Sequence, residues 1–189
     1  MPKKVVVVYG SHRTNGNSTY IVDTLLSTIP EGTAEVQKFY LKDLNIHNCT
    51  GCSRCRAEDS KCMHDDDMTT LLESIMSADK IVLATPIFMF QAASTFSQFQ
   101  QRCYPLLTGT NGQYTRRMEP KDTVMVYSQG APVPFAFQTY IDLNQNSLTM
   151  LGFNVVETIV CTGANPIGSA EQNTELVQRT LETGRKFFA

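Results

Sequence analysis

Residues 5–18 read Val-Val-Val-Val-Tyr-Gly-Ser-His-Arg-Thr-Asn-Gly-Asn-Ser, and this stretch decides the fold. Four consecutive valines followed at once by turn-forming residues predict a strand buried on both faces, because only such a strand can be apolar throughout. That strand belongs in the interior of a parallel sheet. Residues 18–29 then carry apolar side chains on one helical face, at positions 21, 22, 25, 26 and 29. The predicted unit is therefore strand, loop and helix N-terminus.

The loop of this unit is rich in hydroxyl and amide side chains and carries one arginine, Arg13. A helix N-terminus presents unpaired N–H groups and the positive end of the helix dipole, so a loop of this composition suits an anion. Two well-known phosphate loops do not match: Gly16 is followed by Asn17 rather than lysine, and Gly10 has no glycine two residues later. We therefore expect a monophosphate held by Ser, Asn and backbone groups. The alternative is an ordinary capped turn between strand and helix.

The rest of the chain alternates between apolar runs and amphipathic segments. Strands are predicted at 34–41, 80–86, 123–128 and 155–161, with the second of these runs ending at Pro86, which cannot donate to a ladder. Helices are predicted at 68–76, 94–104, 137–151 and 170–188, and residues 108–120 are expected to form a mobile surface segment. Five strands alternating with helices predict an α/β fold, a doubly wound five-stranded parallel sheet in three α/β/α layers. We expect residues 1–189 to form a single domain.

A cysteine-rich loop at residues 49–67 interrupts this alternation. Cys49, Cys52, Cys55 and Cys62 are spaced so that three thiolates can converge on one centre and a fourth can close it, as in [4Fe–4S] clusters. Four thiolates could also bind zinc, or the cysteines could remain free thiols. Three aspartates, 65–67, follow and are expected to cap the next helix and face solvent. Cys103 and Cys161 fall in apolar patterns and are expected in the core.

Two blocks carry a resemblance to a known family. Gly-Ser-x-Arg-x-x-Gly-Asn-Ser after the first strand resembles the FMN phosphate loop of the flavodoxin-like NAD(P)H-dependent FMN reductases. The cysteine block, with Asp66-Asp67-Met68, resembles the iron–sulfur flavoprotein branch of that superfamily. The resemblance covers about the first half of the chain. It implies a flavodoxin-like fold, bound FMN and a redox reaction.

The flavodoxin-like strand order brings three loops to one edge of the sheet. In the order 2-1-3-4-5, ligands bind where the sheet reverses direction, so the loops after strands one and three converge. The loop after strand three is apolar enough to pack a flat ring, and it contains Thr85, Pro86, Ile87 and Phe88. A third loop offers backbone donors to the polar rim of a ring, at Ser128, Gln129 and Gly130. A site that binds a phosphate at one end and a flat apolar ring at the other would suit FMN.

The resemblance also assigns roles to single residues. It implies that the phosphate is held by Ser11, Arg13, Asn17, Ser18 and Thr19, and that Pro86 to Phe88 line the isoalloxazine ring. Related sequences often carry tyrosine where Phe88 stands and glycine where Phe90 stands. They also often carry a lysine and an aspartate in the next helix, where Ser97 and Gln101 stand here. These departures leave the phosphate loop intact and concern the ring and the stacking of a substrate on it.

We predict an FMN-dependent oxidoreductase that takes hydride from NADH or NADPH and passes electrons to a small-molecule acceptor, such as a quinone, a nitro or azo compound, or a flavin. No catalytic side chain is expected, because the flavin carries the chemistry. One alternative is an iron–sulfur flavoprotein, with FMN and a [4Fe–4S] cluster, that exchanges electrons with ferredoxin-like partners. The other is a non-catalytic zinc-binding module.

The charge and the apolar runs of the chain indicate which classes of partner to expect. Sixteen Lys and Arg against eighteen Asp and Glu give a net charge of −2, which gives no support to nucleic-acid or membrane-surface binding. The chain has no apolar run of membrane-spanning length and no leader at its start, so we expect a cytoplasmic protein. The aromatic helix after the third strand leads us to expect a homodimer or homotetramer.

Overall fold

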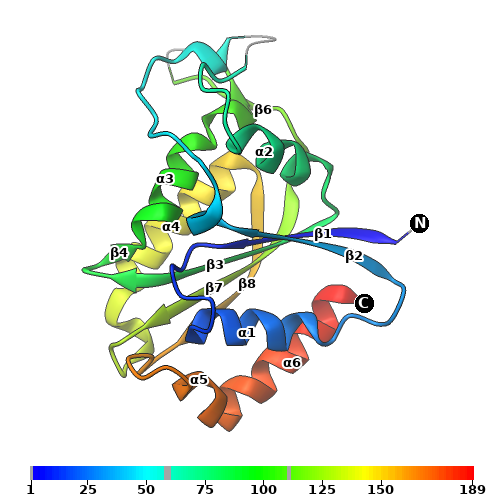
Figure 1. Cartoon of the computed structure of the whole chain (residues 1–189), viewed down its shortest axis with the longest axis vertical. Helices are drawn as coiled ribbons and strands as arrows, with labels where there is room; N and C mark the ends of the chain where they lie inside the picture. Colours follow the sequence, from blue (N-terminus) through cyan, green and yellow to red (C-terminus); the bar gives the residue numbers. More distant parts are fainter. Residues whose placement is uncertain (1, 58–60, 110–111) are drawn as a thin grey trace.

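A computed structural model describes residues 2–57, 61–109 and 112–189. Its main sheet has five parallel strands in the order β2-β1-β3-β7-β8, which confirms the predicted flavodoxin-like order (Figure 1). The strands are β1 (Lys3–Tyr9), β2 (Ala34–Tyr40), β3 (Lys80–Phe88), β7 (Lys121–Gln129) and β8 (Phe153–Cys161). A short strand, β4 (Gln91–Ala92), pairs antiparallel with the end of β3.

Helices cover both faces of this sheet and make the three predicted layers. One face carries α1 (Asn17–Leu26), α5 (Ser169–Gln172) and α6 (Thr174–Phe188) (Figure 1). The other carries α2 (Met68–Ser77), α3 (Ser94–Arg102) and α4 (Gln138–Leu151). Because successive strand residues point to opposite faces, Val5 and Val7 pack with α1 while Val6 and Val8 pack with α2 and α3. This two-sided burial explains the uninterrupted valine run.

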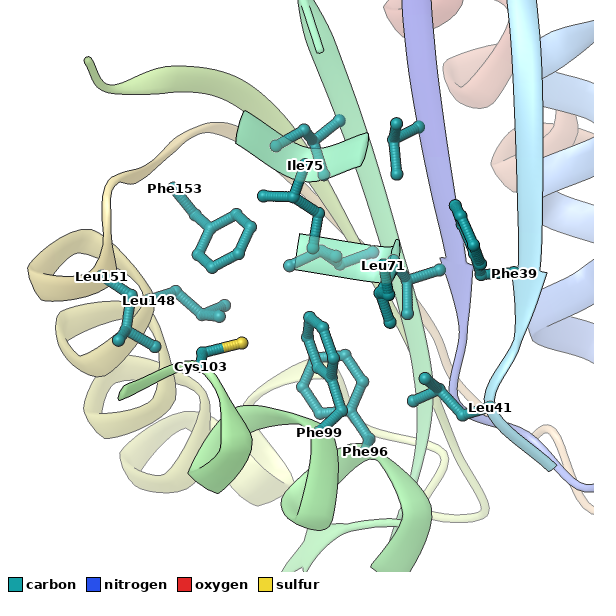
Figure 2. Close-up of a cluster of buried hydrophobic side chains, with 14 of the residues drawn as sticks. Phe39, Leu41, Leu71, Ile75, Phe96, Phe99, Cys103, Leu148, Leu151 and Phe153 are labelled. Carbon is teal, nitrogen blue, oxygen red and sulfur yellow. The ribbon is translucent and has the colours of Figure 1, made fainter. Parts of the chain in front are cut away.

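The core on the α2–α3–α4 face contains the aromatic residues of α3. Phe96 and Phe99 are fully buried and meet side chains from α2, α4 and β8 (Figure 2). Cys103 belongs to the same cluster and Cys161 to the cluster on the opposite face, as predicted. The aromatic side chains of α3 therefore serve the core and offer no surface for a second copy.

Most predicted elements differ from the observed ones by a few residues at their ends, and three segments of the chain differ in a way that has a physical reason or adds an element. β3 runs past Pro86 to Phe88 because the ladder to β1 ends at Ala84, so the proline's missing N–H interrupts no pairing on that side. The predicted helix at 170–188 is divided into α5 and α6 at Asn173, whose side chain accepts a hydrogen bond from Leu176 N and caps α6. The segment 108–120 takes part in a small hairpin, β5 (Leu107–Thr108) with β6 (Thr115–Arg116), and its residues 110–111 lie outside the described residues.

Short 3-10 helices occupy connecting segments, at Leu41–Asp43, Arg54–Arg56, Tyr104–Leu106 and Pro134–Phe137. None of the helices in the described ranges has the length and apolar character needed to cross a bilayer. The carboxyl ends of β1, β3 and β7 point to the same edge, at the left of Figure 1. The described parts of the loop at residues 44–67, which are 44–57 and 61–67, extend from the α2–α3–α4 layer at the top.

Candidate functional site

The loop after β1 leads into an open helix N-terminus. Gly16 is the N-cap of α1, and among the described residues no side chain caps this end. Ser11 Oγ accepts a hydrogen bond from Arg13 N at 3.0 Å, and Thr19 Oγ1 contacts Arg13 O at 3.4 Å, so both hydroxyls shape the loop. Ser18 is buried in the first turn of the helix. The positive end of the α1 dipole is thus left available to a ligand.

Asn17 joins this helix to the loop after β8. Its Nδ2 donates to Ala164 O at 2.9 Å and to Pro166 O at 2.8 Å, and its Oδ1 accepts from Ala170 N at 3.1 Å. The side-chain amide is therefore fully engaged within the protein. Any contact of Asn17 with a bound anion would come from its backbone N–H.

A cavity of about 120 Å³ lies in front of this N-terminus, where four loops meet. All the predicted cofactor-binding residues line it except Thr19 and Thr85. Thr85 is fully buried, and its Oγ1 contacts Pro86 O and accepts from Ala93 N, so it supports the turn behind the cavity. The lining residues are Ser11, Arg13, Gly16, Asn17, Ser18, Pro86, Ile87, Phe88, Ser128, Gln129, Gly130, Ala164 and Asn165.

Ala164 and Asn165 were missed by the sequence reasoning. They follow β8, the strand next to β7, and the carboxyl end of a parallel strand was the signal that could have found them. Asn165 packs closely on Gly130, where an added Cβ would collide with the Asn165 side chain. The fourth loop therefore fits against the third because Gly130 has no side chain.

Gln129 leaves one polar atom without a partner inside this cavity wall. The residue is buried, its Nε2 donates to Val133 O at 2.7 Å, and its Oε1 has no hydrogen-bond partner in the described part of the chain. Buried acceptors are rarely left unpaired, because the lost hydrogen bond to water costs about 1–3 kcal/mol. A ligand with an N–H group would satisfy this oxygen.

The apolar end of the cavity opens onto a turn with unusual backbone angles. Met89 and Phe90 join β3 to β4 with φ of 46° and 65°, a conformation that side-chain-bearing residues rarely adopt. Phe88 is 57% exposed, and the Phe90 ring contacts Phe137 edge-on at a centroid distance of 5.0 Å. An aromatic surface therefore stands at the mouth of the cavity.

The four predicted cysteine ligands line a second cavity, of about 140 Å³, which shares no lining residue with the first. Its wall also includes Met63, His64 and Tyr104. Cys55 is buried, and burial followed by the nearby Cys62 and Cys49 raises the pKa of its thiol. Residues 58–60 of this loop lie outside the described residues.

The spacing of these thiols bears on what they could bind. Within the described ranges, no three Cys, His, Asp or Glu side chains are close enough together to hold one metal ion. A single tetrahedral zinc requires its four sulfurs roughly 3.8 Å apart, given Zn–S bonds of about 2.3 Å. A [4Fe–4S] cluster is larger than an ion, and each thiolate binds a different iron. The four thiols that line this cavity match the number of cysteine ligands that either group takes.

Arginines hold the cysteine loop in place. Arg117 Nη2 donates to Cys55 O at 3.2 Å and to Ala57 O at 2.6 Å. The Arg56 guanidinium lies 5.5 Å from the ring centroids of both Tyr104 and Tyr114. These contacts attach the loop to the β5–β6 hairpin and to the segment after α3.

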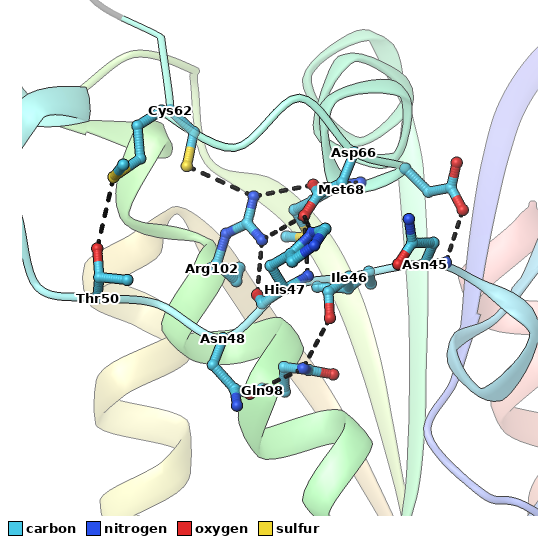
Figure 3. Close-up of polar contacts among 12 residues, drawn as sticks. Asn45, Ile46, His47, Asn48, Thr50, Cys62, Asp66, Met68, Gln98 and Arg102 are labelled. Atoms are coloured by element: carbon cyan, nitrogen blue, oxygen red, sulfur yellow. Dashed lines mark hydrogen bonds and ion pairs between the residues drawn. The ribbon is translucent and has the colours of Figure 1, made fainter.

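Asp66 does not face solvent, contrary to the prediction for the three aspartates. Its side chain is fully buried and forms a two-pronged ion pair with Arg102, with N–O distances of 2.7 and 2.9 Å (Figure 3). Burial alone would raise the pKa of Asp66, but hydrogen bonds from Arg102 and from His47 N outweigh it and hold that pKa well below its usual range. Asp67 also serves the loop, because its Oδ2 accepts from Asn45 N at 2.7 Å.

Solved structures with this fold include several oxidoreductases. An azoreductase from Bacillus anthracis superposes with a TM-score of 0.77 at 15% identity, covering 98% of this chain and 100% of that one. An NAD(P)H:quinone oxidoreductase from Methanothermobacter marburgensis superposes with a TM-score of 0.72 at 14% identity, covering 98% of each chain. An FMN-dependent NADH-azoreductase from B. anthracis, solved in complex with FMN, gives a TM-score of 0.70 at 13% identity over 100% of both chains. At these identities the likeness shows the fold.

Curated relatives are similar over part of the chain. An iron–sulfur flavoprotein of Methanocaldococcus jannaschii is 32% identical over 106 residues, which is 56% of this chain and 54% of that protein. One from Archaeoglobus fulgidus is 26% identical over 165 residues, covering 87% and 79%. The match thus spans about half the length of the first relative. The model of the NADPH-dependent FMN reductase family matches residues 3–129, and the chain belongs to that family.

Proposed function

We propose that the cavity at the carboxyl edge of the sheet binds FMN. The phosphate would lie at the α1 N-terminus beside Ser11, Ser18 and Arg13, and the ring would lie between the loops after β3 and β7. The observation that carries this proposal is the shared cavity, which has an uncapped helix N-terminus at one end and Phe88 at the other. The unpartnered Gln129 Oε1 supports it, because the isoalloxazine ring carries an N–H donor.

The activity we infer is transfer of reducing equivalents from NADH or NADPH to a small-molecule acceptor. Bound FMN would supply the hydride and electron transfer, so the protein's task is to bind and orient the reactants. Arg13 and the first-turn N–H groups of α1 would fix the phosphate. Phe88 and the Met89–Phe90 turn would present an aromatic surface at the mouth, where a flat acceptor such as a quinone or azo compound can stack.

An anaerobic reductive titration tests this activity. FMN-loaded protein mixed with NADPH or NADH should lose its flavin absorption, and adding a quinone or an azo dye should restore it. Arg13→Ala should retain less flavin, whereas Arg179→Ala, which removes the same charge from the exposed face of α6, should behave as wild type. FMN-loaded protein that neither nucleotide reduces would contradict the assignment.

A second candidate, an iron–sulfur flavoprotein, is favoured by the four thiols around one cavity and by the names of the curated relatives. Anaerobically prepared protein should then contain iron and sulfide and absorb broadly near 400 nm, as is typical of cysteine-ligated clusters. Cys55→Ala should lose that absorption, whereas Cys161→Ala, in the core beside β7, should keep it. Bound zinc without sulfide would favour the zinc-binding alternative, and wild-type protein with neither iron nor zinc would leave the cysteines as free thiols.

The assembly of two or four copies also stays a proposal. The exposed apolar residues at the cavity mouth, Phe88, Met89 and Phe90, are the surface that a second copy could cover. Size-exclusion chromatography with light scattering measures the number of copies directly.

A further inference from the structure

Arg102 is a buried arginine that reaches one of the four cysteines. Its side chain is 1% exposed, at the end of α3. Nη1 donates to Asp66 Oδ2 and to His47 O, both at 2.7 Å, and Nη2 donates to Asp66 Oδ1 at 2.9 Å (Figure 3). The remaining Nη2 hydrogen bond goes to Cys62 Sγ at 3.4 Å. Every N–H group of the two terminal nitrogens therefore donates a hydrogen bond, and one of these N–H groups points at the Cys62 sulfur.

Stability alone does not explain an arginine at this position. A buried ion pair returns little net free energy, because desolvation of the two charges offsets their attraction, and apolar residues of similar volume often do as well. Arg102 also leaves its Nε buried without a partner among the described residues. An apolar pair could fill the space, but it could not donate to Cys62.

We propose that Arg102 is a positioning residue of the four-cysteine site, where its N–H···S hydrogen bond, aimed by Asp66, places Cys62 and raises the reduction potential of a [4Fe–4S] cluster bound there. This inference rests on the second candidate function above. Hydrogen bonds to cluster sulfurs and the net charge nearby are among the factors that set such potentials. An N–H directed at a ligand sulfur stabilises the more negative, reduced form of the cluster.

Asp66 has a separate effect, through charge. Its carboxylate neutralises the guanidinium, so in the native protein the hydrogen bond acts without a net positive charge beside the cluster. Removing the negative charge from Asp66 would leave Arg102 positive beside Cys62, which would stabilise the reduced cluster further. Replacing Arg102 and replacing Asp66 should therefore shift the reduction potential of the cluster in opposite directions.

This opposition separates the proposal from a purely structural role. If the pair only braced the loop at residues 44–67, removing either partner would loosen the same contacts and shift the potential the same way. The test is a redox titration of the anaerobically reconstituted protein. The electron paramagnetic resonance signal of the reduced cluster is recorded at each potential. The variants are Arg102→Met and Asp66→Asn, with Arg179→Met as a control that removes an exposed arginine on α6.

We expect Arg102→Met to lower the midpoint potential, Asp66→Asn to raise it, and Arg179→Met to leave it unchanged. If Arg102→Met does not retain its cluster, Arg102→Lys keeps the charge but loses the fork geometry and should still lower the potential. An unchanged potential in a loaded Arg102 variant, or shifts of the same sign in the Arg102 and Asp66 variants, overturns the proposal. Wild-type protein that assembles no cluster instead overturns the second candidate function, and this role of Arg102 with it.

Discussion

The side-chain amide of Asn17 donates a hydrogen bond to the backbone oxygen of Pro166 at 2.8 Å, joining the first turn of α1 to the loop after β8. Asn17→Ala would leave Ala170 N and two carbonyl oxygens without this partner. We expect the free energy of unfolding to fall by about 1–3 kcal/mol, measured by urea denaturation. FMN affinity should fall as well, because the fourth wall of the cavity is released. Full FMN affinity in Asn17→Ala would show that this wall does not matter.

Gly130 gives a second prediction about the same wall. A Cβ there would meet the end of the Asn165 side chain, which is exposed and can move aside, so the cost should lie at the low end of the about 1–3 kcal/mol typical of overpacking. Gly130→Ala should therefore lower the melting temperature and weaken FMN binding. The double variant Gly130→Ala/Asn165→Ala removes the obstructing atoms and should recover much of the stability. No recovery in the double variant would show that the glycine is needed for another reason.

A substitution of Met89 that suits the backbone of the Met89–Phe90 turn should make the protein more stable. Met89 is 86% exposed with φ of 46°, so its side chain contributes little packing while its backbone conformation is unfavourable by about 1–2 kcal/mol. Met89→Asn should raise the melting temperature, because asparagine tolerates this conformation better than other side chains. Met89→Val, β-branched, should lower it. If the turn presents the acceptor, Met89→Asn should also slow its reduction.

The Asp66–Arg102 pair predicts a pH-dependent stability. Because the pKa of folded Asp66 lies below its ordinary value of 3.8, the ionised carboxylate stabilises the fold above that pH, and this contribution is lost as the pH falls toward the folded pKa. Asp66→Asn should cost about 3–5 kcal/mol at neutral pH, as expected for breaking a buried pair. The difference from wild type should shrink below pH 3.8. A difference that stays constant down to pH 2 would contradict the ion pair.

The sequence predicted the sheet order and most of the residues that line the cavity at the carboxyl edge of the sheet, because both depend on local patterns. The valine run marks β1, and topology then brings the loops after β1, β3 and β7 to one edge. Arg102 was not predicted. It stands three residues after Phe99 and next to Cys103, on the buried side of α3, but nothing local shows that its partner is Asp66, 36 residues away. The break at Asn173 could have been predicted, because asparagine is a strong N-cap.

The proposed activity requires that the N-terminus of α1 hold a phosphate. The most direct test is to titrate the flavin-free protein with FMN and with riboflavin, which lacks the phosphate, and to compare the two dissociation constants in wild type and Arg13→Ala. We predict that wild type binds FMN at least about 100-fold more tightly than riboflavin, because each charge-assisted hydrogen bond to the phosphate contributes about 1.5–3 kcal/mol. Arg13→Ala should reduce this difference in affinity between the two flavins. Equal affinities for the two flavins in the wild-type protein would contradict the central claim.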